Sequence, residues 1–141
     1  MILSDNKDLV DWMRELPSLY ETERKIFVHA GVDEEAEEYW KWGTADDMFI
    51  WIYPPTKGRF IKTVVSGHIG TGDSSLANDR SFHEVFYDGA SHYYIDGGIY
   101  KGGNLLLLAY DEETGRYCSV KGKESGGLLP INKPWNHDEN G

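Results

Sequence analysis

Two histidines end apolar, strand-like runs and are followed within two residues by glycine. His29 ends the run in "KIFVHAG", residues 25–31, and His68 ends the run in "KTVVSGHIGTG", residues 62–72. Ligand sites in sheets of this kind gather at the carboxyl ends of strands, where glycine lets the backbone come close. The two imidazoles are therefore candidate ligands of a divalent metal.

Two imidazoles supply only part of the ligand shell of such a metal. Hydrolytic metal sites usually add carboxylates, and two-metal sites need a bridging group between ions roughly 3.5–4 Å apart. Asp96, in "YIDGG" at another strand end, is the nearest candidate carboxylate by residue type. The residues alone thus predict half of a metal site.

The other histidines and the single cysteine have ordinary structural interpretations. His83 and His92 stand near the starts of strand-like runs and are interpreted as surface or satisfied core residues, and His137 lies in a region of turn residues near the carboxyl end. Cys118, in "RYCSV", is interpreted as a packing residue on a strand, which argues against a thiol mechanism.

The elements that must position the histidine pair form an α+β pattern. A first helix is predicted after Asp5 and ends at Pro17, and a second is predicted over residues 45–53, capped by Thr44. Two short extended pieces lie about a polar turn at 22–24, and the carboxylates of 33–38 are typical of a solvated helix start or loop.

From residue 60 onward the sequence is rich in strand-forming residues. Runs separated by Gly, Asn and Asp turns predict mostly antiparallel strands, the last four as consecutive hairpins: residues 60–67, 83–89, 91–98, 104–111 and 116–121. Helices in the first third and strands afterwards indicate an α+β domain over residues 1–123. Residues 124–141 lack periodicity and are predicted to form a loosely packed tail.

Composition limits the classes of partner. The chain has 141 residues and a formal net charge of -10, which argues against nucleic acid as the main partner without excluding a local anion site. No stretch approaches the roughly 18 apolar residues of a membrane span, and the first ten residues have no apolar run of signal-peptide length. We therefore expect a soluble, cytoplasmic protein that has no membrane partner.

Three motifs together resemble the later half of the calcineurin-like metallophosphoesterases, in particular the bacterial serine/threonine protein phosphatase branch. They are "FVHAGVD", "VVSGHIGTG" and "YYIDGGIYKGGNLLLLAYD", in this order, and the resemblance runs from about residue 5 to residue 120. In that family, histidines at the first two motifs bind the second of two metals. The resemblance implies that His29 and His68 are metal ligands.

The earlier motifs of that family are absent from the sequence. Relatives begin with Asp-x-His, then Gly-Asp-x-x-Asp-Arg, then Gly-Asn-His-Glu, which supply the other metal ligands, a phosphate-binding Arg and the proton donor. None of the three occurs here. The chain thus resembles the carboxy-terminal part of the family's α/β/β/α sandwich, and no catalytic residue is assigned within it.

The resemblance implies hydrolysis of phosphate monoesters by a protein Ser/Thr phosphatase-like enzyme. The complete enzyme would hold two divalent metals, Mn or Fe/Zn, and act on a phosphoprotein or a small phosphoester. Whether this chain alone binds a metal stays open, and it is expected to have little or no activity. Two alternatives stay open. One is a dinucleoside polyphosphate hydrolase of the same superfamily, and the other is a non-catalytic binding module that has lost the amino-terminal motifs.

Substrate contacts depart from the family pattern at one position. Many relatives carry an Arg near the end of a "FLWIR" helix, where this chain has Tyr53 in "MFIWIYPP". The family Arg grips the phosphate with a bidentate fork, which neither Tyr nor Lys can copy. Lys57 or Arg59 on the following loop are candidate substitutes for its charge. Tyr100 and Lys101, in the loop "DGGIYKGG", are further candidate substrate contacts.

The missing first strands also predict a partner. A sheet that lacks neighbouring strands exposes an edge and apolar surface, which proteins usually cover by pairing. We therefore expect a homodimer or another pairing through the exposed sheet edge.

Overall fold

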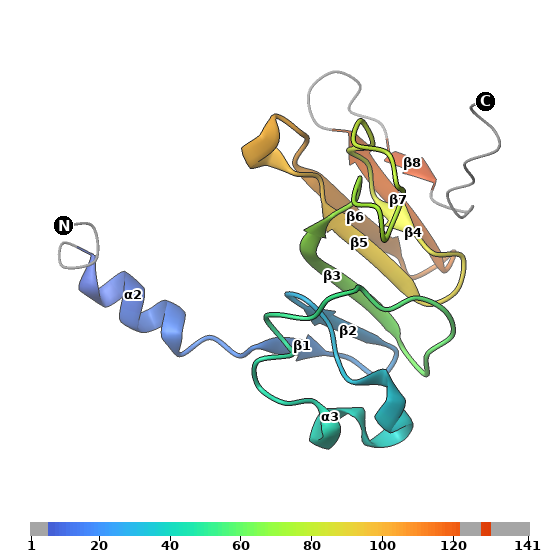
Figure 1. Cartoon of the computed structure of the whole chain (residues 1–141). Helices are drawn as coiled ribbons and strands as arrows, with labels where there is room; N and C mark the ends of the chain where they lie inside the picture. The colour runs from blue at the N-terminus through green and yellow to red at the C-terminus, as the bar shows by residue number, and fades with distance from the viewer. Residues whose placement is uncertain (1–5, 122–127, 131–141) are drawn as a thin grey trace.

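The fold is mixed α+β, with few helices and a mostly sheet-based body (Figure 1). The computed structural model describes residues 6–121 and 128–130. The helical elements are α2 (Lys7–Arg14), η1 (Glu34–Tyr39, a 3-10 helix), α3 (Trp40–Gly43) and η2 (Ile99–Lys101, also 3-10). As expected, the α-helices precede residue 60.

The larger sheet, sheet A, has parallel strands at its centre and antiparallel strands at its edges. Its order is β1-β2-β3-β5-β4, where the strands are β1 (Leu19–Glu21), β2 (Lys25–Val28), β3 (Thr63–Gly70), β4 (Phe86–Tyr87) and β5 (His92–Asp96). β3 is parallel to both β2 and β5. The long crossovers after β2 and β3 make this pairing possible, since parallel strands cannot be joined by a tight turn.

The smaller sheet, sheet B, is antiparallel. Its order is β6-β7-β8, with β6 (Leu106–Asp111), β7 (Arg116–Lys121) and β8 (Leu128–Pro130). β8 falls within the predicted tail; the rest of that tail, residues 124–127 and 131–141, lies outside the described residues.

The prediction that the last four strands are joined as consecutive hairpins is wrong for the connection between the second and the third of them. β4–β5 and β6–β7 are antiparallel pairs, but β5 and β6 belong to different sheets. The loop between them turns through Gly98 and Gly102, whose φ angles of 68° and 84° are favourable only for glycine. The expectation of mostly antiparallel strands after residue 60 is also wrong for β3, which has only parallel neighbours.

The first predicted helix is present, and the second is absent. α2 spans Lys7–Arg14 with Asn6 at its N-cap, whereas residues 46–50 form turns and no helix. Thr44 ends α3 instead of starting a helix: its hydroxyl donates to the Trp40 carbonyl and accepts from the Asp33 N–H. The Phe49 carbonyl accepts from Ala30 N–H at 2.9 Å, which holds this segment against the end of β2.

The hydrophobic core lies on both faces of sheet A. On one face, a cluster forms beneath η1, α3 and the turns that follow: Ile26, Val28, Val32, Trp40, Phe49 and Val64. On the opposite face, Val65 and Tyr93 pack against Leu106 of sheet B. Each strand of the sheet centre therefore has a face turned to each layer. His29, which follows β2, and His68, which lies within β3, are thus carried by strands that are packed on both faces.

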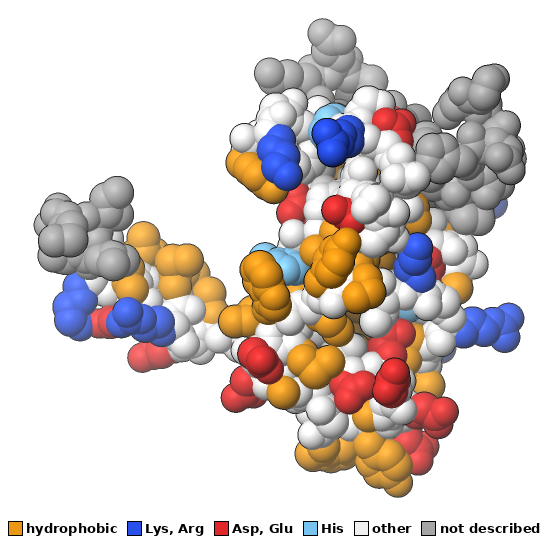
Figure 2. All heavy atoms as spheres, viewed as in Figure 1, with side chains coloured by type: hydrophobic (Ala, Val, Ile, Leu, Met, Phe, Trp, Pro, Cys, Tyr) orange, Lys and Arg blue, Asp and Glu red, His pale blue; other side chains and the backbone are white. Residues whose placement is uncertain are grey.

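Part of sheet A and all of α2 are uncovered. Sheet B reaches Lys25, whose ammonium lies 3.4 Å from the centre of the Tyr110 ring, but Tyr20 and Phe27 on the same face remain 66% and 38% exposed. No residue of α2 is buried, and Figure 2 shows its hydrophobic side chains on a projecting arm. The expected pairing with another chain stays a prediction that this surface favours.

Among the described residues, no helix has the length and apolar character needed to cross a membrane.

Candidate functional site

The structure brings His29 and His68 together. β2 and β3 are parallel with Val28 opposite Ser66, so His29, directly after β2, and His68, near the end of β3, lie at the same end of the central strands. The expectation that the strand ends at His68 is wrong, because β3 continues to Gly70. Nε2 of His29 lies 3.2 Å from Nδ1 of His68, and the ring centres are 5.0 Å apart. The Gly67 N–H donates to the His29 carbonyl at 3.0 Å and fixes the two strand ends relative to each other. The two side chains are thus direct neighbours, and their role as metal ligands stays a prediction.

The backbone at His68 has a conformation that non-glycine residues rarely adopt. Its φ angle is 64°, and the pairing of β3 with β5 is irregular between Ser66 and Gly70. Irregularities of this kind turn a side chain away from the direction that regular strand alternation would give it. Left-handed backbone at a non-glycine residue costs energy and is concentrated at functional sites.

An aromatic ring and a carboxylate form the surroundings of His68. The Trp51 ring meets His68 edge to face, with 4.8 Å between ring centres. Burial lowers the pKa of His68, the neighbouring His29 lowers it further, and Asp96 partly offsets both effects. Trp51 was not singled out from the sequence, where it read as part of a helix face.

The described residues contain no group of three or more His, Cys, Asp or Glu side chains placed to hold one metal ion. Asp96 ends the neighbouring strand β5, but its Oδ1 accepts from the Gly98 N–H at 2.9 Å. Within the described part of the chain, no carboxylate joins the two imidazoles in such a group, and their role as metal ligands stays a prediction.

The candidate substrate contacts are not gathered in one place. Tyr53 and Arg59 are exposed on the loop after residue 52, and the Lys57 ammonium donates to the Ser75 carbonyl at 2.7 Å. None of these three lines the pocket described next, whereas Tyr100 and Lys101 do. Their roles in substrate binding stay predictions.

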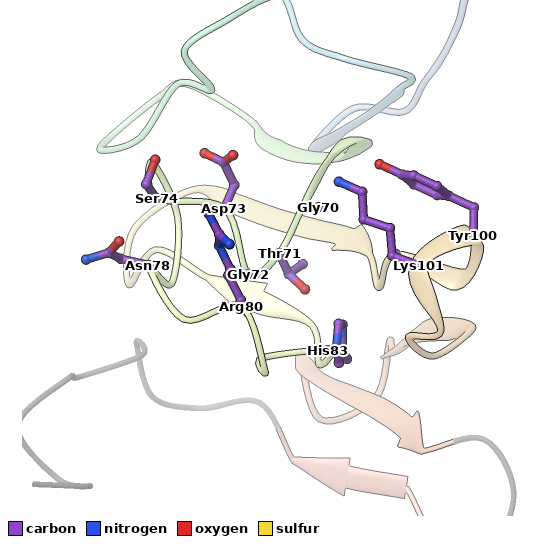
Figure 3. Close-up of a pocket in the computed structure, with 11 residues that line it drawn as sticks. Gly70, Thr71, Gly72, Asp73, Ser74, Asn78, Arg80, His83, Tyr100 and Lys101 are labelled. Atoms are coloured by element: carbon purple, nitrogen blue, oxygen red, sulfur yellow. The ribbon is translucent and has the colours of Figure 1, made fainter.

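A pocket of about 650 Å³ opens beyond the histidine pair, at the ends of β3 and β5 (Figure 3). Its walls are the loop after β3, which carries Thr71, Asp73 and Arg80, and the η2 loop, which carries Tyr100 and Lys101. Sequence reasoning missed this pocket, although the glycines around Thr71 marked a loop where backbone comes close.

A second cluster, of one histidine and two carboxylates, is buried between sheet A and η1. Nδ1 of His92 lies 2.8 Å from Asp88 Oδ2, and Nε2 lies 2.7 Å from Glu34 Oε1. The side chains of His92, Asp88 and Glu34 are 1%, 2% and 15% exposed. His92 is thus a satisfied core residue, as expected, but Glu34 corrects the interpretation of 33–38 as a fully solvated carboxylate run.

Electrostatics in this buried cluster favour an ion pair. Burial by itself lowers the pKa of His92, but hydrogen bonds to Asp88 and Glu34 outweigh it and raise that pKa to about 9. Burial likewise raises the pKa of Asp88, but hydrogen bonds from His92 and from the N–H groups of Gly58 and Ala90 lower it to about 2. All three groups have partners, so the cluster has a structural role.

Comparison of the chain with protein-family models finds no match, and comparisons with curated proteins and with solved structures find no significant one. The resemblance to metallophosphoesterases therefore rests on the sequence motifs and stays a prediction.

Proposed function

We propose that the chain is the carboxy-terminal portion of a metal-dependent phosphoesterase that hydrolyses phosphate monoesters and is protein Ser/Thr phosphatase-like. His29 and His68 bind one divalent metal, Mn or Fe/Zn, and the remaining ligands come from outside this chain. The observation that carries the proposal is the 3.2 Å distance between His29 Nε2 and His68 Nδ1.

That distance fits two ligands of a single ion. Nitrogens bound at about 2.1 Å, with an angle of roughly 90–110° at the metal, lie about 3.0–3.4 Å apart. The backbone supports the same interpretation, because His68 keeps a left-handed φ of 64° that directs its ring beside His29. Both imidazoles can present a lone pair to the ion, since each needs only its neutral form to bind metal.

In the complete enzyme, the bound metals would supply an acidified bridging water and neutralise charge on the phosphoryl group. The described part of this chain contributes the two imidazoles, and Trp51 covers one side of the His68 ring and limits its rotation. The bridging acid and the proton donor belong to motifs that this sequence lacks. In this proposal the chain holds metal but does not turn over substrate on its own.

The uncovered part of sheet A also supports the proposal that the chain is part of a metallophosphoesterase domain. Sheet B covers the β3–β5 part of sheet A and leaves Tyr20 and Phe27 exposed beside β6, which has no strand on its outer side among the described residues. In the α/β/β/α sandwich that the motifs predict, further strands of the second sheet would lie there. The uncovered face is thus the expected location of the missing amino-terminal part.

The non-catalytic alternative also has an observation in its favour, namely that no third ligand joins the pair within the described residues. The two hypotheses differ in metal binding by the isolated chain. The portion of a phosphoesterase is expected to bind a metal ion through His29 and His68, whereas a non-catalytic module is expected to bind none.

Metal titration of the purified chain tests the proposal. Isothermal titration with Zn²⁺ and Mn²⁺ is expected to show one ion per chain, with binding lost in His29→Ala and in His68→Ala and retained in the control His137→Ala. If wild type binds no metal, or if His29→Ala binds it equally well, the proposal is wrong.

A second measurement tests the claim that the chain is only a portion of the enzyme. Hydrolysis of an aryl phosphate with Mn²⁺ is expected to stay at the background rate. Turnover by the chain alone that disappears in His29→Ala would show that the chain holds a complete site, against the proposal.

A further inference from the structure

The pocket beyond the histidine pair has the size of a small-molecule site. Its volume of about 650 Å³ falls within the roughly 300–1,000 Å³ typical of ligand pockets. Neither His29 nor His68 lines it, so its side chains are available for a ligand of their own. Figure 3 shows the walls converging on one space from the loop 70–83 and the loop 98–101.

Two cations face this space in a protein whose formal net charge is -10. Arg80 comes from the loop after β3 and Lys101 from η2, so the charges approach from different walls. Within the described part of the chain, neither forms an ion pair with a carboxylate. Unneutralised cations that converge on a pocket favour an anionic ligand.

One carboxylate, Asp73, also lines the pocket, but it accepts hydrogen bonds from its own turn. Asp73 Oδ1 accepts from the Ser75 N–H at 2.8 Å and from the Ser75 hydroxyl at 2.5 Å. These hydrogen bonds, with the charge of Lys101 as a smaller cause, lower the pKa of Asp73. The three ionised side chains together therefore leave one net positive charge facing the pocket.

A buried hydroxyl in the same wall lacks a partner. Thr71 is 1% exposed, and its hydroxyl forms no hydrogen bond within the described residues. The Thr71 backbone is fixed, because its N–H donates to the Asp96 carbonyl at 2.8 Å. An unsatisfied buried hydroxyl at a pocket wall requires an explanation, and hydrogen bonding to a ligand supplies one.

The imidazole of His83 and the rigidity of the loops complete the site. Nδ1 of His83 lies 3.0 Å from the Gly97 carbonyl, which leaves Nε2 as the remaining polar atom of the ring. A Cβ at Gly72 would meet the Asp79 carbonyl at 2.5 Å, so the turn that carries Thr71 is packed too closely to accept a side chain there. The backbone turn that carries Thr71 is thus held in place before any ligand binds, whereas Arg80 and Lys101 are exposed side chains.

We infer that this pocket binds the phosphate group of a phosphorylated small molecule through Arg80, Lys101 and the Thr71 hydroxyl, independently of the histidine pair His29–His68. A guanidinium and a hydroxyl from the loop after β3, with an ammonium from η2 on the facing wall, suit a tetrahedral dianion better than a planar carboxylate. The pocket is larger than a phosphate group needs, and the exposed ring of Tyr100 at its rim offers a flat surface to the organic part of the ligand.

The test uses metal-free protein, with EDTA present, and inorganic phosphate and pyrophosphate as probes. NMR shift titrations are expected to show saturable binding that acetate does not reproduce. Arg80→Gln and Lys101→Gln should each weaken it by about tenfold or more. The matched control is Arg24→Gln, which removes the same charge from an exposed side chain outside the pocket and should change affinity by less than about twofold.

Thr71→Val separates ligand binding from folding. Valine has a similar shape without the hydroxyl, so the unfolding midpoint should stay equal or rise while phosphate affinity falls about threefold or more. An unchanged affinity in Thr71→Val would remove the hydroxyl from the site and overturn the inference.

Two further outcomes would overturn it. Equal losses in Arg80→Gln and Arg24→Gln would show unspecific charge attraction, and no saturation by phosphate or pyrophosphate up to about 20 mM would show that no site exists at a useful affinity. His68→Ala is expected to retain phosphate binding. A loss of phosphate affinity in His68→Ala would contradict the independence of the pocket from the histidine pair. Failure of the metal titrations alone would overturn the proposed function and leave the inference about the pocket standing.

Discussion

The two histidine clusters use the same side chain under opposite conditions. His92, in β5 of sheet A, is 1% exposed and has a carboxylate on each ring nitrogen. His29 and His68 lie at the carboxyl ends of the central strands β2 and β3, where each has the other imidazole as its hydrogen-bonding neighbour. The His92 backbone belongs to regular strand β5, while His68 sits in a left-handed conformation within an irregular stretch of β3.

This contrast separates stability from readiness to bind. An imidazole between two carboxylates has its hydrogen bonds completed inside the protein and gains nothing from a metal. An imidazole whose nearest polar neighbour is another imidazole can give its lone pair to an ion. Removing His92 should therefore affect folding, and removing either member of the pair should affect binding, with little effect on folding.

His92→Leu should have the largest effect. It leaves Asp88, 2% exposed, without its cation, and breaking one side of a buried ion pair costs about 3–5 kcal/mol of unfolding free energy. Urea unfolding followed by circular dichroism measures this loss. His29→Ala is the matched control and should cost less than about 1 kcal/mol.

Should His92→Leu not fold, Asp88→Asn supplies a milder version of the same test. It keeps a hydrogen-bonding group beside His92 but removes the charge, so its unfolding free energy should lie between those of wild type and His92→Leu. Equal stabilities of His92→Leu and His29→Ala would remove the distinction between the two clusters.

The pH dependence of stability should come second in size. Because His92 has its pKa raised from 6.5 to about 9, its contribution is complete below pH 6.5 and is lost as the pH rises toward 9. The loss should approach about 1.4 kcal/mol per pH unit within that window. Because Asp88 has its pKa lowered from 3.8 to about 2, its contribution is present above pH 3.8 and is lost as the pH falls toward 2.

Urea unfolding between pH 6 and pH 9 measures the upper part of this profile. His29→Ala should retain the decline, since it leaves the buried cluster intact, and Asp88→Asn should flatten it. A decline of the same slope in Asp88→Asn would assign the effect to other groups.

The neighbourhood of His29 and His68 could be anticipated from the sequence, whereas the buried cluster could not, because only the first two residues are marked by their own local sequence. His29 and His68 each stand at a strand end beside glycine, so local residues mark both positions. Glu34 and His92 are 58 positions apart, and nothing near Glu34 distinguishes it from the other carboxylates of its run. Only the crossover that places η1 over sheet A brings the two together.

Strand positions were predictable, and the arrangement of the strands was not. The five runs after residue 60 all contain strands, yet β5 and β6 enter different sheets because the loop from Gly97 to Asn104 reverses the chain away from sheet A. Turn residues mark where a strand ends but not which sheet the next strand joins. That same loop forms one wall of the pocket of about 650 Å³, so the pocket could not be predicted from the sequence either.

The smallest effect expected is at His68, where the backbone and the ring have competing requirements. Because its φ is 64°, His68→Gly should be more stable than His68→Ala by about 1 kcal/mol, since only glycine adopts this conformation without steric cost. Neither variant keeps the imidazole, so both should lose metal binding equally. Urea unfolding of the two variants measures the difference. Equal stabilities would mean that His68 is not strained, which would take away the backbone part of the argument for a ligand at this position.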